Sequence, residues 1–276
     1  MLRSSNPILS KQDAFTPAAN QYGQYPQNQY GQTPYGQAPY QPYPGQPPVT
    51  APDDRMTFDD VVTKTAVTMG ILAITAALAW MLVPNGLYLP ALILSGLVGF
   101  VVVLVVSLRR NISPGLVLFY AAIEGVFIGM ISKVFEAQYD GIVVQAVIGT
   151  FAAAGVTLAA YKFFNIRVTA KFQKVVVIST IAFAGVMLVN FIFSMATGSA
   201  GLRGGIVGPV SPLAMLISAF AIVLAVLNLV LDFDYIEKGV AMGAPARESW
   251  RGAFGLTVTM VWLYIELLRL LSYLRR

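Results

Sequence analysis

Long apolar segments follow one another along this chain, almost without interruption, from Thr65 to Leu274. Each holds about twenty residues, and an α-helix of that length spans roughly 30 Å, the thickness of the hydrocarbon core of a bilayer. A soluble core does not use so many helices in series that are apolar on every side. The pattern predicts an all-α integral membrane protein, with the lipid bilayer as its first partner.

Polar breaks between the apolar segments divide this region into seven predicted spans. They lie at about residues 65–84, 88–108, 114–133, 141–162, 174–196, 211–236 and 252–273. Ahead of the first span, Thr57 is placed to cap a helix, with Asp59 and Asp60 in the first turn, where carboxylates favour the helix dipole. We therefore expect a transmembrane domain over residues 53–276.

Residues 1–52 have a different composition, with tyrosines spaced through Gln, Gly, Pro and Asn. Such a segment has too little aliphatic surface to offset the entropy of ordering it, and its prolines interrupt any helix. The sequence predicts a disordered N-terminal tail. Two roles remain open for it: a partner-binding segment with aromatic contact sites, and a solvated leader that can be removed without loss.

Basic residues gather on one side of the membrane if the spans alternate. They are Lys64, Arg109, Arg110, Lys162, Arg167, Lys171, Lys174, Lys238, Arg247 and Arg251. The other side carries chiefly Lys133 and Arg203, so the positive-inside rule places the N-terminus in the cytoplasm of a plasma-membrane protein. Arg275 and Arg276 end the seventh span on the opposite side. Either these two charges are translocated, or the last segment is re-entrant.

Composition removes several classes of chemistry. The chain has no Cys and no His, so thiolate nucleophiles, disulfides, the usual zinc ligands and imidazole relays are excluded. It also lacks H-E-x-x-H, G-x-S-x-G and P-loop patterns, and we expect neither an enzyme nor a bound cofactor. The basic residues lie in short loops, where membrane orientation explains them without a nucleic-acid ligand. Proton or cation chemistry must then rest on carboxylates.

One carboxylate lies near the middle of the third predicted span. Glu124 is followed by Gly125 and Gly129, a small-xxx-small pair that lets another helix backbone approach closely. Glu124 is therefore expected to face protein and not lipid. It is either part of an ion pathway or a protonated structural glutamate that is hydrogen-bonded to a neighbouring helix.

A second group of polar residues ends the sixth span. Asn228 and Asp232 are four residues apart and share a helix face, whereas Asp234 points about 200° away from Asp232. Asp232 is therefore the better candidate for a buried carboxylate. Arg109 and Arg110 close the second span on the same side and are candidate partners for it.

The last span adds Thr259 and Glu266, which are seven residues apart and hence on one face of the helix. Glu266 also lies three residues before Arg269, so these two side chains can neutralise each other on the helix surface. Glu266 is thus either a group of the ion pathway or one half of a local ion pair.

Three segments together resemble the Bax inhibitor/YccA-type transmembrane family, in its bacterial branch. They are the Glu-Gly-x-x-x-Gly-x-Ile-Ser pattern within Ile123 to Ser132, the Asp232 ending of the sixth span, and the run from Ala253-Phe254-Gly255-Leu256 through Leu263-Tyr264-Ile265 to Leu271. The resemblance covers roughly residues 58–274 and leaves the tail uncovered.

This resemblance implies a seven-helix bundle with the last helix central and, in some members, a pH-sensitive calcium leak. In those members an aspartate on the sixth span and one on the seventh share a proton and latch the pore. The first falls on Asp232, but Thr259 stands at the place of the second. A threonine cannot share a proton in this way. Either Glu266 compensates, or Asp232 latches to Arg109 or Arg110.

The sequence thus favours a calcium leak channel or a proton-linked cation permeation protein. Its gating residues are expected to be Asp232, Glu124 and Glu266, with Thr259 and Asn228. No metal site is assigned beyond Asp232, a candidate to meet a permeating calcium ion. Other members of the family resemble regulators of a membrane-embedded ATP-dependent protease, and binding such a protease through the tail is the alternative function.

Overall fold

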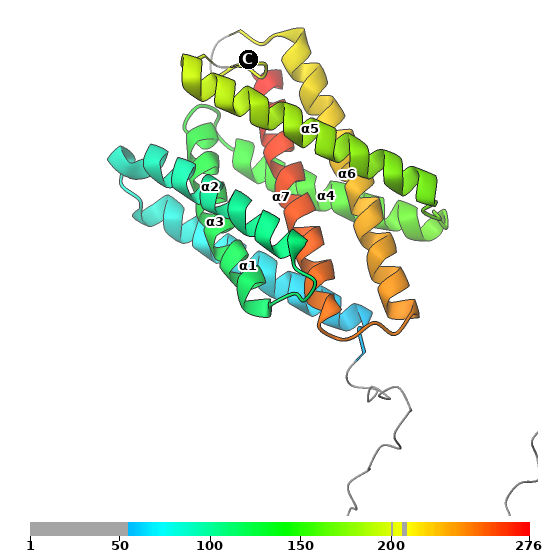
Figure 1. Ribbon diagram of the computed structural model, residues 1–276. Helices are drawn as coiled ribbons and strands as arrows, with labels where there is room; N and C mark the ends of the chain where they lie inside the picture. The colour runs from blue at the N-terminus through cyan, green and yellow to red at the C-terminus, as the bar shows by residue number, and fades with distance from the viewer. Residues whose placement is uncertain (1–54, 200, 206–208) are drawn as a thin grey trace, which may run out of the picture. The chain divides into compact units, whose positions relative to one another are not determined.

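Seven α-helices make up the computed structural model, which describes residues 55–199, 201–205 and 209–276 (Figure 1). They are α1 (Phe58–Leu82), α2 (Tyr88–Leu108), α3 (Pro114–Glu136), α4 (Ile142–Phe163), α5 (Ala170–Thr197), α6 (Pro212–Ala241) and α7 (Glu248–Leu274), with the 3-10 turn η2 (Asn85–Leu87) before α2. All seven are long and apolar enough to cross a membrane, which confirms the predicted fold class. The expectation for residues 1–52 lies outside the described residues.

Most of the helices extend beyond the spans predicted from hydropathy. α1 begins at Phe58, ahead of residue 65, and α6 continues to Ala241, past residue 236. The backbone hydrogen bonds of a helix run on into its polar ends, whereas hydropathy marks only the apolar part. The predicted cap is confirmed, because the backbone N–H of Asp60 donates to Thr57 Oγ1 at 3.1 Å.

α1 and α3 pack with their backbones close together at two glycines. A Cβ on Gly125 would overlap the Leu72 carbonyl and the Thr75 side chain, and a Cβ on Gly129 would overlap the backbone of Ala76. Only glycine leaves room for this approach, as expected for a small-xxx-small pair.

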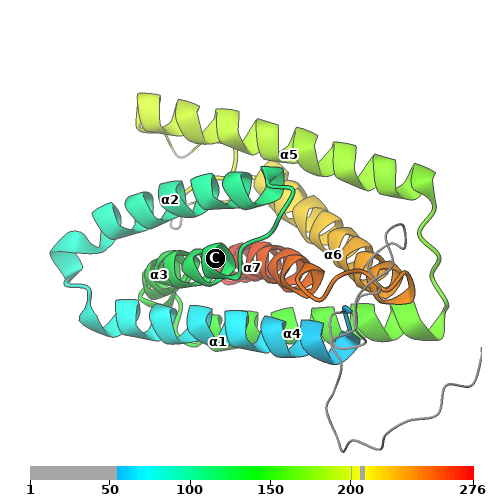
Figure 2. The ribbon, with the colours of Figure 1, turned by 60° about the horizontal axis from the view of Figure 1, so that its bottom comes forward.

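α7 is the central helix, and its neighbours surround it in Figure 2. It packs against α1, α3, α4 and α6 and buries many polar side chains, among them Thr257, Thr259 and Glu266. α5 differs, because Val176 is its one buried residue and most of its apolar side chains are exposed. An exposed apolar surface of this kind suits a helix that faces lipid.

The connections between helices define two ends of the bundle. At the N-terminal end, the backbone N–H of Met56 donates to the Ala244 carbonyl at 2.7 Å, which ties the start of α1 to the α6–α7 connection. At the C-terminal end, Arg275 Nη1 donates to the Asp140 carbonyl at 2.6 Å, which ties the end of α7 to the α3–α4 connection. α7 therefore runs from one end of the bundle to the other, which favours a full span over a re-entrant segment.

Candidate functional site

Asp232 on α6 and Thr259 on α7 are in direct contact. Thr259 Oγ1 donates a hydrogen bond of 2.7 Å to Asp232 Oδ2. The backbone of α7 comes close enough for this because Gly255 has no side chain: a Cβ there would lie 3.0 Å from Asp232 Oδ1. Thr259 stands where the family resemblance places a second acid, and it is the hydrogen-bond partner of the first acid, Asp232.

These two residues line a cavity of about 330 Å³ between α2, α6 and α7. Ser107, Tyr235 and Arg251 supply its other polar side chains, and apolar residues such as Val103 and Phe254 complete the wall. Asp232 lies more than two turns before the end of α6 at Ala241, deeper in the bundle than hydropathy indicates.

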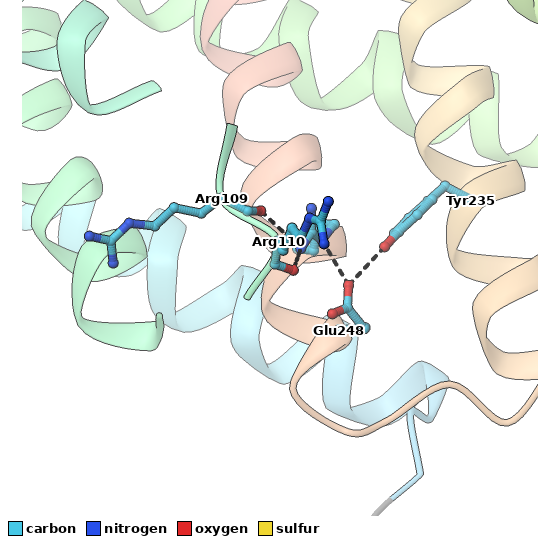
Figure 3. Close-up of polar contacts among 5 residues, drawn as sticks. Arg109, Arg110, Tyr235 and Glu248 are labelled. Carbon is cyan, nitrogen blue, oxygen red and sulfur yellow. Dashed lines mark hydrogen bonds and ion pairs between the residues drawn. The ribbon is translucent and has the colours of Figure 1, made fainter. Parts of the chain in front are cut away.

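A polar cluster lies in the same region, at the N-terminal end of the bundle (Figure 3). Glu248 Oε2 accepts from Arg251 Nε at 2.7 Å and from the Tyr235 hydroxyl at 3.1 Å. Arg251 Nη2 also donates to the Arg110 carbonyl at 2.7 Å. Glu248 thereby joins the first turn of α7 to α6, and Arg251 joins that turn to the connection between α2 and α3.

The structure corrects the expected pairing of Asp232 with Arg109 or Arg110. Neither guanidinium forms an ion pair in the described part of the chain, and both side chains are exposed. α2 ends at Leu108 and Arg109 is extended, so its side chain points away from Tyr235 and Glu248 (Figure 3). These two arginines contribute backbone carbonyls to the cluster, not charge to Asp232.

Asn228 and Asp234 have partners of their own. Asn228 Nδ2 donates to Thr180 Oγ1 on α5 at 2.8 Å and to the Leu224 carbonyl, so its hydrogen bonds link α5 to α6 and do not go to Asp232. Asp234 Oδ2 accepts from Lys238 Nζ at 2.6 Å, one turn along the helix surface. Asp232 and Asp234 thus have different partners, as their angular separation predicts.

Glu124 is buried in α3 and lies against α2. A Cβ on Gly99 would lie 2.6 Å from Glu124 Oε2, so the glycine makes room for the carboxylate. Among the residues that the structure describes, no side chain or backbone group hydrogen-bonds to Glu124. It does not line the cavity of Asp232, so the structure does not bring these two predicted gating residues together.

Glu266 pairs with a residue that sequence reasoning did not connect to it. Its Oε1 accepts from Arg203 Nη1 at 2.8 Å, and the exposed fractions of the two side chains are 3% and 11%. The local ion pair with Arg269, one of the two alternatives for Glu266, does not form, since the guanidinium that pairs with Glu266 comes from the α5–α6 connection. The sequence holds one sign of this pairing: Arg203 is the one charged residue between Thr197 and Pro212.

Across the described ranges, no group of three or more Asp, Glu, His or Cys side chains is placed to hold a metal ion. The acids near the cavity are Asp232, hydrogen-bonded to a hydroxyl, and Glu248, paired with Arg251. Asp232 lies on the cavity wall and, unlike Glu248, has no basic partner among the described residues.

Comparison with known proteins identifies the family. A family model described as Bax inhibitor 1 like matches residues 6–276, almost the whole chain. This confirms the resemblance to the Bax inhibitor family, and the match extends over most of the tail, which the motifs left uncovered. A search of curated proteins finds no match.

Proposed function

The chain belongs to the Bax inhibitor 1 like family, and from its site geometry we propose that it is a cation leak protein permeated by calcium. The hydrogen bond between Thr259 and Asp232 holds its pathway closed. The family and the seven spanning helices make it a multi-pass membrane protein. Permeation, the ion and the gate are the proposed part.

The observation that carries this proposal is the position of Asp232. It places a carboxylate with no basic partner on the wall of a cavity between three spanning helices. Acidic side chains at membrane depth are costly and mark ion pathways when they face a cavity. A carboxylate oxygen is also the ligand that calcium prefers.

Closure of the pathway follows from the contact itself. A hydrogen bond to a charged group contributes about 1.5–3 kcal/mol, and this one joins α6 to the central helix α7. The cluster of Glu248, Arg251 and Tyr235 joins the same helices nearer the N-terminal end. Separating α6 from α7 breaks the first contact and exposes the carboxylate to a passing cation. Because a carboxylate titrates, the flux is expected to depend on pH.

The proposal places the protein in the plasma membrane with its N-terminus in the cytoplasm. Support comes from the basic residues Lys64, Lys162 and Arg167, which belong to the N-terminal end of the bundle. No catalytic step, cofactor or nucleic-acid partner is part of the proposal. The alternative role as a regulator of a membrane protease rests on residues 1–52, outside the described ranges.

Calcium entry into proteoliposomes that hold the purified full chain tests the proposal. We expect entry above that of protein-free liposomes, with a rate that changes with pH. Asp234→Asn is the matched control, because Asp234 pairs with Lys238 and should leave the rate and its pH profile unchanged. Entry no faster than in protein-free liposomes at every pH would contradict permeation and favour the regulatory role.

A further inference from the structure

A second polar group lies toward the C-terminal end of the bundle, apart from the cavity of Asp232. Arg203 extends from the α5–α6 connection into the bundle, where its Nη1 pairs with Glu266. The Tyr273 hydroxyl donates to the Arg203 carbonyl at 2.7 Å, and the guanidinium lies over the Phe183 ring, 5.4 Å from its centre. α5 and α7 thus hold this loop residue in place from two sides.

Four polar atoms of this group are buried and have no partner in the described part of the chain: Arg203 Nε, Arg203 Nη2, Arg269 Nε and Glu266 Oε2. Nε and Nη2 form one edge of a guanidinium, the fork that binds two oxygens of an oxyanion in parallel. Leaving charged donors buried without an acceptor is costly. The two arginines therefore lack a hydrogen-bond acceptor for these donors.

The charges of the group do not balance. Arg203 and Arg269 carry two positive charges, and Glu266 supplies one negative charge. Burial lowers the pKa of the Arg203 guanidinium, Glu266 acts against this, and the neighbouring charge of Arg269 adds to it. An added monoanion removes the excess charge.

We propose that Arg203 and Arg269 bind a phosphate-type monoanion whose own donor group reaches Glu266 Oε2. The arginine edges supply the donors for its oxygens, and Glu266 Oε2 accepts one hydrogen bond in return. Two sources share this chemistry: dihydrogen phosphate, which carries hydroxyl donors, and an anionic phospholipid headgroup with a hydroxyl group beside its phosphate. This site does not depend on the proposed cation permeation, and its test uses no flux measurement.

Thermal unfolding of the purified full chain tests the site. Trp262 stacks on Phe183 at 5.9 Å, next to Arg203, and its fluorescence reports on this region. One arm compares sodium phosphate at mildly acidic pH, where the monoanion prevails, with sodium chloride at equal ionic strength. The second arm compares lipid nanodiscs of phosphatidylglycerol and phosphatidylcholine. The choline headgroup has the phosphate but no hydrogen-bond donor.

We expect a saturable rise in unfolding temperature in one of the two arms. A rise with sodium phosphate identifies the free anion. A rise with the glycerol lipid, but not with choline lipid, identifies the headgroup. Either rise should be lost in Arg269→Gln, which keeps the Arg203–Glu266 pair, and in Arg203→Lys, which keeps the charge but loses the fork.

Arg167→Gln is the control, since Arg167 is an exposed arginine at the other end of the bundle. It should retain the full rise. Phosphate also stabilises proteins by exclusion from their surface, an effect that all variants share. Equal rises in wild type, Arg269→Gln and Arg203→Lys, or no rise in either arm, would overturn the proposal.

Discussion

Thr259 on the central helix α7 donates a hydrogen bond of 2.7 Å to Asp232 on α6. Two turns further along the same face of α7, Glu266 pairs with Arg203 from the α5–α6 connection at 2.8 Å. One helix face therefore connects α7 to its surroundings at two depths, first through a hydroxyl and a carboxylate and then through a buried ion pair. We assign closure of the pathway to the first contact.

Asp232→Asn should make calcium entry less dependent on pH and weaken the closed state. The substitution removes the charge and keeps the shape, so the contact with Thr259 changes from a charge-assisted to a neutral hydrogen bond, which is about half as strong. Entry rates into proteoliposomes across a series of pH values measure both effects. A variant that keeps the wild-type rate and pH profile would show that Asp232 has a structural role only.

Glu266→Gln should destabilise the protein strongly. It leaves the buried Arg203 without a charged partner, and removing one partner of a buried pair costs about 3–5 kcal/mol. Thermal unfolding in detergent measures the loss. The double variant Glu266→Gln/Arg203→Gln should recover part of it, because the buried charge of Arg203 is removed together with that of its partner. Equal losses in the single and double variants would mean that the pair is not the source of the effect.

Gly125→Ala and Gly129→Ala should each lower stability by about 1–3 kcal/mol, because the added methyl group overlaps the backbone of α1. The matched control is Gly185→Ala on α5, where no atom lies within 4 Å of the added Cβ. It should be neutral or slightly stabilising, since alanine is the better helix former. Unfolding temperatures in one detergent compare the three variants. Equal effects at all three positions would contradict the close packing of α1 and α3.

Cysteine labelling in intact cells should establish the membrane orientation, because the natural chain has no cysteine. Gln138→Cys lies in the α3–α4 connection and Asn111→Cys in the α2–α3 connection, and both positions are exposed. A membrane-impermeant maleimide should react with Gln138→Cys and spare Asn111→Cys. The reverse pattern would place the N-terminus outside the cell.

The sequence predicts the seven helices well, because apolar length alone decides which segments cross a bilayer. The Gly125 and Gly129 contact is likewise local, as it depends on residue size and helix period. The family resemblance is what relates Thr259 to Asp232. Arg109 and Arg110 are candidate partners of Asp232 only because they close a helix at the same side of the membrane. That reasoning failed because the chain leaves α2 in an extended conformation and turns both side chains outward.

The partner of Glu266 lay beyond local reasoning for a related reason. Arg269 is one turn away on the same helix, and Arg203 is 63 residues away in a loop. Helix period predicts only neighbours on one helix, whereas the path of the α5–α6 connection depends on the tertiary packing of α5 and α7. A lone arginine in a glycine-rich connection is the one sign in the sequence of a residue held by the bundle.

Calcium entry into proteoliposomes, compared among wild type, Thr259→Val and Thr259→Ser, tests the central claim most directly. Valine keeps the shape of threonine and removes the donor, so the closed state loses a contact worth about 1.5–3 kcal/mol, or about ten- to hundredfold in the ratio of open to closed protein. The account predicts faster entry for Thr259→Val and a near wild-type rate for Thr259→Ser, which keeps the hydroxyl. Equal rates for the valine and serine variants would contradict a latch between Thr259 and Asp232.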